Sequence, residues 1–174
     1  MKRRGFTIVE LIITITIMGI LLTLAVVNVG TTQAKSRDEA RKADIEAIAS
    51  NLESFFATGT DNSTIFARYP SMELVGTAPT IIASLRDANI NSFLPPGTND
   101  VTLTFLASTN AGTLPGIQTT TGVTPQPTKD SYVYQPIKTD GSICLAGETD
   151  CRKFNLFYRL ESDMTVYKVT SKNQ

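Results

Sequence analysis

The sequence contains no histidine among its 174 residues, and this absence removes whole classes of chemistry. A Ser-His-Asp triad, a Cys-His pair, an imidazole metal site and acid–base catalysis by histidine are all excluded. Catalysis by carboxylates alone needs two acids whose surroundings separate their pKa values, and no pair of Asp or Glu lies in such an apolar context. We therefore expect a protein that is not an enzyme and that needs no cofactor and no metal.

The sequence also lacks an excess of charge of either sign. Its 16 Lys and Arg residues offset its 16 Asp and Glu residues, so the formal net charge is zero. Such a chain has no overall basic field to attract nucleic acid. At this length we expect one domain with its own core rather than two.

What the sequence does contain is a long apolar run close to its N-terminus. Glu10 is the only charged residue between Phe6 and Val29. As a helix, the 19 residues from Leu11 to Val29 would span about 28 Å, close to the thickness of a bilayer core. A secretory signal peptide has a shorter apolar region, so we expect this segment to be retained. A carboxylate at the bilayer centre costs about 2.5–3.5 kcal/mol, so Glu10 needs a cation unless it lies near the interface.

The residues that open the chain resemble the signature of prepilins. A short basic leader, Met1 to Gly5, precedes the run Phe6-Thr7-Ile8-Val9-Glu10 and the apolar segment. This arrangement resembles the class III signal peptide, with its N-terminal methylation motif, of type IV pilins and their relatives. The resemblance is strong over the N-terminal helix and only general beyond it.

The resemblance implies roles for single residues. A prepilin peptidase would cut between Gly5 and Phe6, and its methyltransferase activity would methylate the new amine of Phe6. Glu10 would neutralise the terminal amine of a neighbouring subunit, which supplies the missing cation and sets the axial register of assembly. Residues 1–5 are then a cleaved leader, and residues 6–30 are a helix that crosses the membrane before assembly and lies in the filament core afterwards.

Residues 31–174 are expected to form the globular domain. An amphipathic helix over about 33–57 carries apolar side chains at helical spacing between Ile45 and Phe56. Arg41, with Lys42, Asp44, Glu46 and Glu53, is expected to lie mostly outside this apolar stripe. The second half of the long helix would thus be covered by a domain, while the first half would be bare.

The C-terminal part of the chain has the pattern of a sheet. Beyond residue 100, short runs alternate apolar and polar residues, as in Phe154 to Leu160 and Met164 to Val169, and predict three or four antiparallel strands separated by variable loops. The apolar stripe of the helix would cover one face of this sheet. The predicted fold class is α+β, a pilin-like lollipop with a protruding apolar helix and a small antiparallel sheet.

Two cysteines, Cys144 and Cys151, enclose a short polar loop. A metal site would need two further ligands, and the sequence offers no histidine and no third cysteine. A disulfide is therefore favoured, and with it an oxidising compartment. Many type IV pilins close a C-terminal loop with a disulfide, which this pair resembles, although the loop here is small. A calcium site around Asp140, Glu148 and Asp150 is a weaker idea, because carboxylates in loops are usually only solvated.

The leading functional hypothesis is a structural subunit, the major pilin of a type IV pilus (fimbrium) serving adhesion, twitching motility or surface contact. It would sit in the cytoplasmic membrane as a single-pass protein with its N-terminus inside, and afterwards in the extracellular pilus. Its partners would be copies of itself, the prepilin peptidase and methyltransferase, and an assembly platform in the membrane.

Three other functional interpretations of the sequence remain open. A pseudopilin of a type II secretion system, or a minor or DNA-uptake pilin, would share the same leader and helix. From a different class, a monomeric membrane-tethered binding domain would leave the bond between Gly5 and Phe6 uncut and Glu10 without a role.

Overall fold

One helix, α1 (Ile8–Thr58), runs without a break for 51 residues, about 77 Å at 1.5 Å per residue. The computed structural model describes residues 5–59, 67–85, 88–110 and 116–173. Thr7 has an extended backbone, and its hydroxyl accepts a hydrogen bond from the amide of Glu10, which caps the N-terminus of the helix. Gly59 ends the helix with a φ of 66° and donates its amide to the carbonyl of Phe55.

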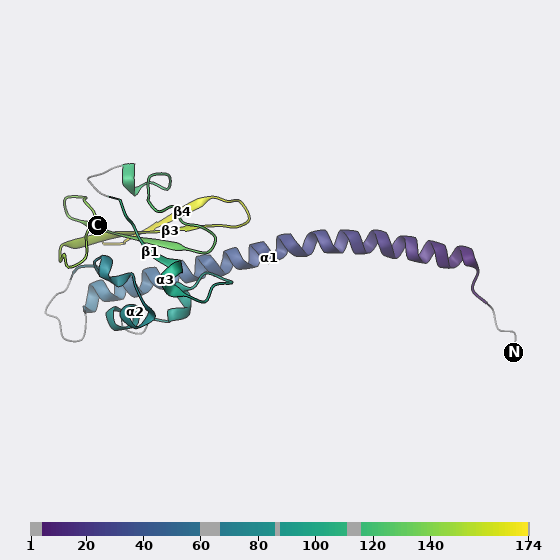
Figure 1. Cartoon of the computed structure of the whole chain (residues 1–174), viewed down its shortest axis with the longest axis horizontal. Helices are drawn as coiled ribbons and strands as arrows, with labels where there is room; N and C mark the ends of the chain where they lie inside the picture. Colours follow the sequence, from purple (N-terminus) through teal and green to yellow (C-terminus); the bar gives the residue numbers. More distant parts are fainter. Residues whose placement is uncertain (1–4, 60–66, 86–87, 111–115, 174) are drawn as a thin grey trace.

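The two halves of α1 lie in different surroundings. Every residue from Gly5 to Ala25 is exposed, and this half protrudes from the rest of the chain (Figure 1). In the second half, Ile45, Ile48 and Leu52 are fully buried at the three- and four-residue spacing of one helix face. The helix therefore belongs to the domain only from about its middle onward.

Four strands form one sheet in the order β1-β2-β3-β4. They are β1 (Phe105–Ala107), β2 (Tyr132–Lys138), β3 (Cys151–Arg159) and β4 (Val166–Thr170). The pairs β2–β3 and β3–β4 are antiparallel, as predicted.

The prediction of a wholly antiparallel sheet is wrong for the first strand, because β1 runs parallel to β2. The chain between Ala107 and Tyr132 is long enough to return to the same end of the sheet, as a parallel pair requires. The fold class nevertheless remains α+β, with a long N-terminal helix and a small mixed sheet.

The core lies between three layers. The sheet covers one side of α1, while α2 (Ala78–Ser84) lies on the other side (Figure 1). A four-residue helix, α3 (Val101–Thr104), and the short 3₁₀ helices η1 (Met72–Leu74), η2 (Ile90–Phe93) and η3 (Gly116–Gln118) complete the regular structure of the described residues. Aromatic rings join the layers edge to face, with centroids 4.8 Å apart for Tyr69 and Phe154 and 4.9 Å for Phe93 and Phe105.

The outer face of the sheet carries a second, smaller core. Val123, Val133 and Phe157 are buried together there. Two buried amides lie beside them: Asn155 donates to Gln135 (2.9 Å), and Gln135 donates to the carbonyl of Ile117 (3.0 Å). Both faces of the sheet are therefore covered, one by α1 and the other by the connection that precedes β2.

Candidate functional site

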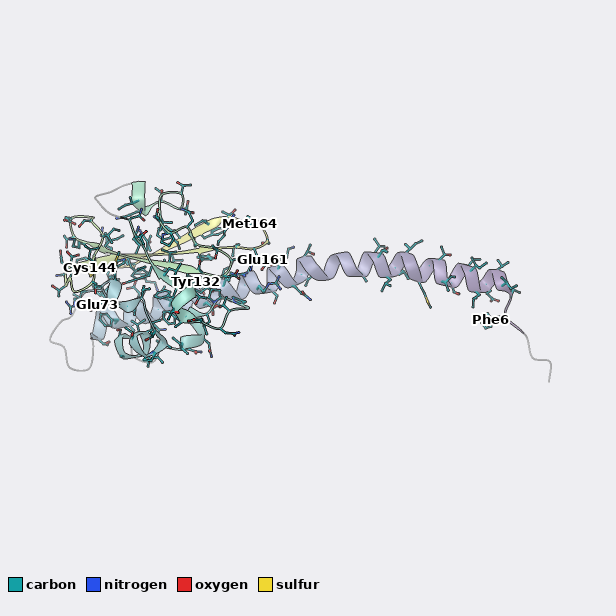
Figure 2. The ribbon with its side chains drawn as sticks, viewed as in Figure 1. Phe6, Glu73, Tyr132, Cys144, Glu161 and Met164 are labelled. Atoms are coloured by element: carbon teal, nitrogen blue, oxygen red, sulfur yellow. A yellow bond between two sulfur atoms is a disulfide. The ribbon has the colours of Figure 1, made fainter. Side chains whose placement is uncertain are left out.

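The residues that the sequence singles out at the N-terminus lie at the far end of the exposed helix. Gly5 and Phe6 precede the first helical residue, and Phe6 is 82% exposed (Figure 2). The remaining leader residues, 1–4, lie outside the described part of the chain. Glu10 is exposed in the first turn of α1, and its carboxylate has no ion-pair partner among the described residues. A negative charge there interacts favourably with the helix dipole.

The exposed half of α1 is apolar on every side. Thirteen large apolar side chains between Phe6 and Leu24 are each at least 52% exposed. Among the described residues, α1 is the one helix long and apolar enough to cross a membrane. Such a surface is stable only in lipid or against other apolar surfaces, because no part of the domain covers it.

Three threonine hydroxyls of this half are already satisfied within the helix. The hydroxyls of Thr14, Thr16 and Thr23 donate to carbonyls three or four residues earlier, at 2.7–2.8 Å. A hydroxyl that bonds its own backbone can enter hydrocarbon without an unpaired donor. The three threonines are therefore compatible with a membrane, and Glu10 is the one charged group of this segment.

Where the bare half of α1 meets the domain, charged side chains hold the helix to the turn between β3 and β4. We call Arg37, Asp38, Arg41 and Glu161 the junction cluster. Arg37 donates two hydrogen bonds, of 2.6 and 2.9 Å, to the carboxylate of Glu161. Asp38 accepts the backbone amides of Glu161 at 2.7 Å and Ser162 at 2.9 Å. In Figure 2, Glu161 lies beside α1 at the end of the domain from which the exposed helix emerges.

Arg41 is the buried centre of this cluster. Its side chain is 1% exposed, yet it donates to Asp38 (2.9 Å), to Glu161 (3.3 Å) and to the carbonyl of Lys129 (2.9 Å). A buried guanidinium is tolerated only when its charge and its donors are paired. The cluster meets this condition and joins α1 to two separate parts of the chain.

The carboxylates of the cluster are held in their charged form. Burial of Asp38 opposes ionisation, but the amides of Glu161 and Ser162, with Arg41, bring its pKa below the ordinary value. The hydrogen bond from Arg37 is the main cause of the lowered pKa of Glu161. Both acids therefore remain charged at neutral pH and keep the arginines paired.

The prediction that Arg41 lies outside the buried stripe of α1 is wrong. Arg41 is four residues before Ile45 and continues the row of Ile45, Ile48 and Leu52. The position of Arg41 in that row was the only sign in the sequence that it is buried. A charged residue is nevertheless predicted to be exposed unless its partner is known. Glu161 lies 120 residues away, and no local pattern connects the two.

One turn further along α1, Asp44 faces the sheet. It accepts a hydrogen bond of 3.0 Å from the hydroxyl of Tyr132, a buried residue of β2. Burial raises the pKa of Asp44 to about 6, although Tyr132 and Arg41 act in the opposite direction. Burial, with the nearby Asp44, also raises the pKa of Tyr132 above its ordinary value.

Cys144 and Cys151 form a disulfide with their Cα atoms 5.6 Å apart, and both residues are fully buried. The bond ties the start of β3 to the segment that follows β2. The carboxylates nearby do not form a calcium site, because no group of three potential metal ligands occurs in the described residues. Glu148 instead pairs with Lys138 (3.0 Å) and accepts the amide of Leu145 (2.6 Å), which holds the loop internally.

Comparison with known families finds the prokaryotic N-terminal methylation motif at residues 1–26. This match confirms the resemblance to a type IV pilin-like class III signal peptide, and it supports a pilin-like or pseudopilin protein processed by a prepilin peptidase. Proteins of this kind are structural subunits. The motif and the apolar helix together fit anchoring in a membrane before assembly. No curated protein and no solved structure matches the chain significantly.

The junction cluster generates a prediction about stability. Arg41→Met should lower the free energy of unfolding by about 3–5 kcal/mol, because it leaves Asp38 charged and buried without its cation. Lys42→Met is the matched control, since the neighbouring Lys42 pairs with Glu39 at the surface and exposed pairs contribute less than about 1 kcal/mol. Denaturant unfolding of the full chain in detergent measures both. Equal losses in the two variants would contradict the assigned role of Arg41.

Asp44 generates a prediction about pH. Its pKa of about 6 in the folded chain lies above the ordinary value of 3.8, so the folded state binds the proton more tightly. The stability that this provides is complete below about pH 4 and is lost as the pH rises through about 6. Asp44→Asn should keep the bond from Tyr132, flatten this slope and stabilise the chain at pH 7 by roughly 1 kcal/mol, after discounting for a half-solvated group. Unfolding curves between about pH 4.5 and pH 7 test this, and an unchanged slope in the variant would refute it.

Proposed function

We propose that this chain is the main structural subunit of a type IV filament. A prepilin peptidase cuts it between Gly5 and Phe6, the new amine of Phe6 is methylated, and the exposed half of α1 packs against copies of itself in an extracellular fibre. Before assembly the same half crosses the cytoplasmic membrane with its N-terminus inside.

The observation that carries this proposal is the bare, all-round apolar half of α1 behind a methylation motif. Burial of apolar area contributes about 25 cal/mol per Å². The many exposed apolar side chains of this half therefore strongly favour contact with any surface that excludes water. A membrane provides such a surface for the single chain. Once the helix leaves the lipid, other copies of the same helix are the surface that matches it all round.

Glu10 supplies the register of this packing. Its carboxylate is costly in lipid, and so is the amine that cleavage creates on Phe6. The two charges become tolerable when the amine of one copy meets the carboxylate of the next. Because each copy carries both groups at its own N-terminal end, the pairing requires neighbouring helices to be staggered along their axes.

The junction cluster gives this stagger a consequence for the whole subunit. Arg37, Asp38 and Arg41 form hydrogen bonds with the β3–β4 turn. These bonds connect α1 to the domain in addition to the covalent chain. A helix whose position is set in the filament core then also sets the position of its domain on the filament surface.

The first experiment examines the N-terminus of protein sheared from the surface of native cells. Intact-mass and peptide analysis should find a chain that begins at methylated Phe6 and is recovered in long filaments. A processed chain that stays in short periplasmic or membrane assemblies would point to a pseudopilin or minor pilin. A chain that still begins at Met1 and is found only in membranes would support the tethered binding domain instead.

A matched pair of substitutions tests Glu10. Glu10→Ala should leave the subunit folded and processed in the membrane but reduce sheared filaments by at least roughly tenfold, because one charge pair per interface is lost. Glu39→Ala, at an exposed position of the same helix beside the junction cluster, removes a carboxylate that pairs only with Lys42 among the described residues, and it should assemble normally. Immunoblots of sheared and membrane fractions give both quantities. Normal assembly of the Glu10 variant would refute the role in register.

A further inference from the structure

The turn between β3 and β4 holds an exposed methionine in an unfavourable backbone conformation. Met164 has a φ of 59° and is 59% exposed. This left-handed region is costly for side chains larger than glycine, and Asn or Asp fill it more readily than methionine does. A large apolar side chain in water adds a second cost at the same residue. Strain of this kind, when it is retained at the surface, suggests a functional contact.

The surrounding residues fix the turn in place. Asp163 accepts the amide of Thr165 (2.9 Å) and the hydroxyl of Tyr167 (2.8 Å). The carbonyl of Met164 itself accepts a hydrogen bond of 2.9 Å from Arg159. On the other side of the turn, the amides of Glu161 and Ser162 bind Asp38 of α1. Met164 is therefore presented on a preorganised support, so less conformational entropy is lost when a partner binds.

The location of this turn separates Met164 from Leu145, another exposed apolar residue of the domain. Figure 2 shows Met164 and Glu161 together at the end of the domain from which the bare half of α1 emerges, whereas Cys144 lies at the opposite end. Leu145, next to Cys144 in the sequence, is comparably exposed at 54%. Two side chains of similar exposure thus lie at opposite ends of the same domain.

We propose that Met164 is a contact between subunits, and that the surface it meets belongs to a second copy of this chain. This inference rests on the proposed function. Neighbouring copies that cover the bare half of α1 must also come close to the domain at the root of that helix. The turn with Met164 is the part of the sheet that lies there, and its exposed apolar side chain offers a contact to a neighbouring copy.

Oxidation of the unmodified protein tests the contact without any substitution. Dilute hydrogen peroxide converts exposed methionine to the sulfoxide, and a covered thioether reacts more slowly. Mass spectrometry of detergent-solubilised subunits and of intact filaments should show Met164 protected by about fivefold or more in the filaments. Met72, in η1 on another part of the domain, is the internal control and should react at the same rate in both samples. Equal reactivity of Met164 in the two samples would overturn the proposal.

A pair of substitutions gives the second readout. Met164→Asn suits the left-handed conformation, so the unfolding midpoint of the full chain in detergent should stay the same or rise, while sheared filaments should fall by roughly tenfold. Leu145→Asn is the matched control and should assemble within about twofold of the unmodified chain. Normal assembly of Met164→Asn, or a loss that follows a lower unfolding midpoint, would overturn the inference. If Glu10→Ala abolishes filaments while Met164→Asn does not, the proposed function stands and this contact fails.

Discussion

The structure depends on one helix that serves two environments without interruption. The first half of α1 is exposed from Ile8 to Ala25, and the second half is the central element of the domain core. At the change between them lies the junction cluster, where Asp38 and Arg41 are almost completely buried. If the helix could turn freely at this point, the position of the apolar half would carry no information about the position of the domain. The cluster bonds α1 to the β3–β4 turn and so sets the orientation of the domain relative to the helix at this point.

The contact between the helix and the β3–β4 turn in the junction cluster is made by charged groups rather than by apolar ones. Apolar residues of similar volume often stabilise a core as well as a buried ion pair does, because desolvation offsets much of the attraction between the charges. Hydrogen bonds, however, have direction, and a guanidinium with five donors allows few arrangements of its partners. Arg41 contacts the helix, the β3–β4 turn and the segment before β2 at once. The arrangement therefore specifies an orientation more strictly than an apolar contact of the same area would.

The same turn connects the helix to the surface of the domain. Asp38 binds its backbone at Glu161 and Ser162, and two residues later Met164 faces solvent in a left-handed conformation. The β3–β4 turn is thus held from within by charge and carries an apolar group outward. The opposite end of the domain is held by the disulfide of Cys144 and Cys151.

Features with a local cause could be predicted from the sequence. The apolar run, the single charge of Glu10 and the leader follow from composition and from the order of residues. The length of α1 and the antiparallel pairing of β3 with β4 follow from periodicity and from a short connection. The parallel pairing of β1 could not be predicted, because it depends on the path of the long segment between Ala107 and Tyr132, which carries no periodic signal of its own.

The sequence by itself therefore determined the long apolar segment and the N-terminal methylation motif, since both reside in consecutive residues. Only the tertiary structure decided how the helix is joined to the domain. From its local sequence alone, Arg41 is predicted to be exposed to solvent. It is buried in the fold because the sheet brings Glu161, 120 residues later, next to it. A pairing of that kind depends on the distance between two side chains in space, and the order of residues along the chain does not contain it.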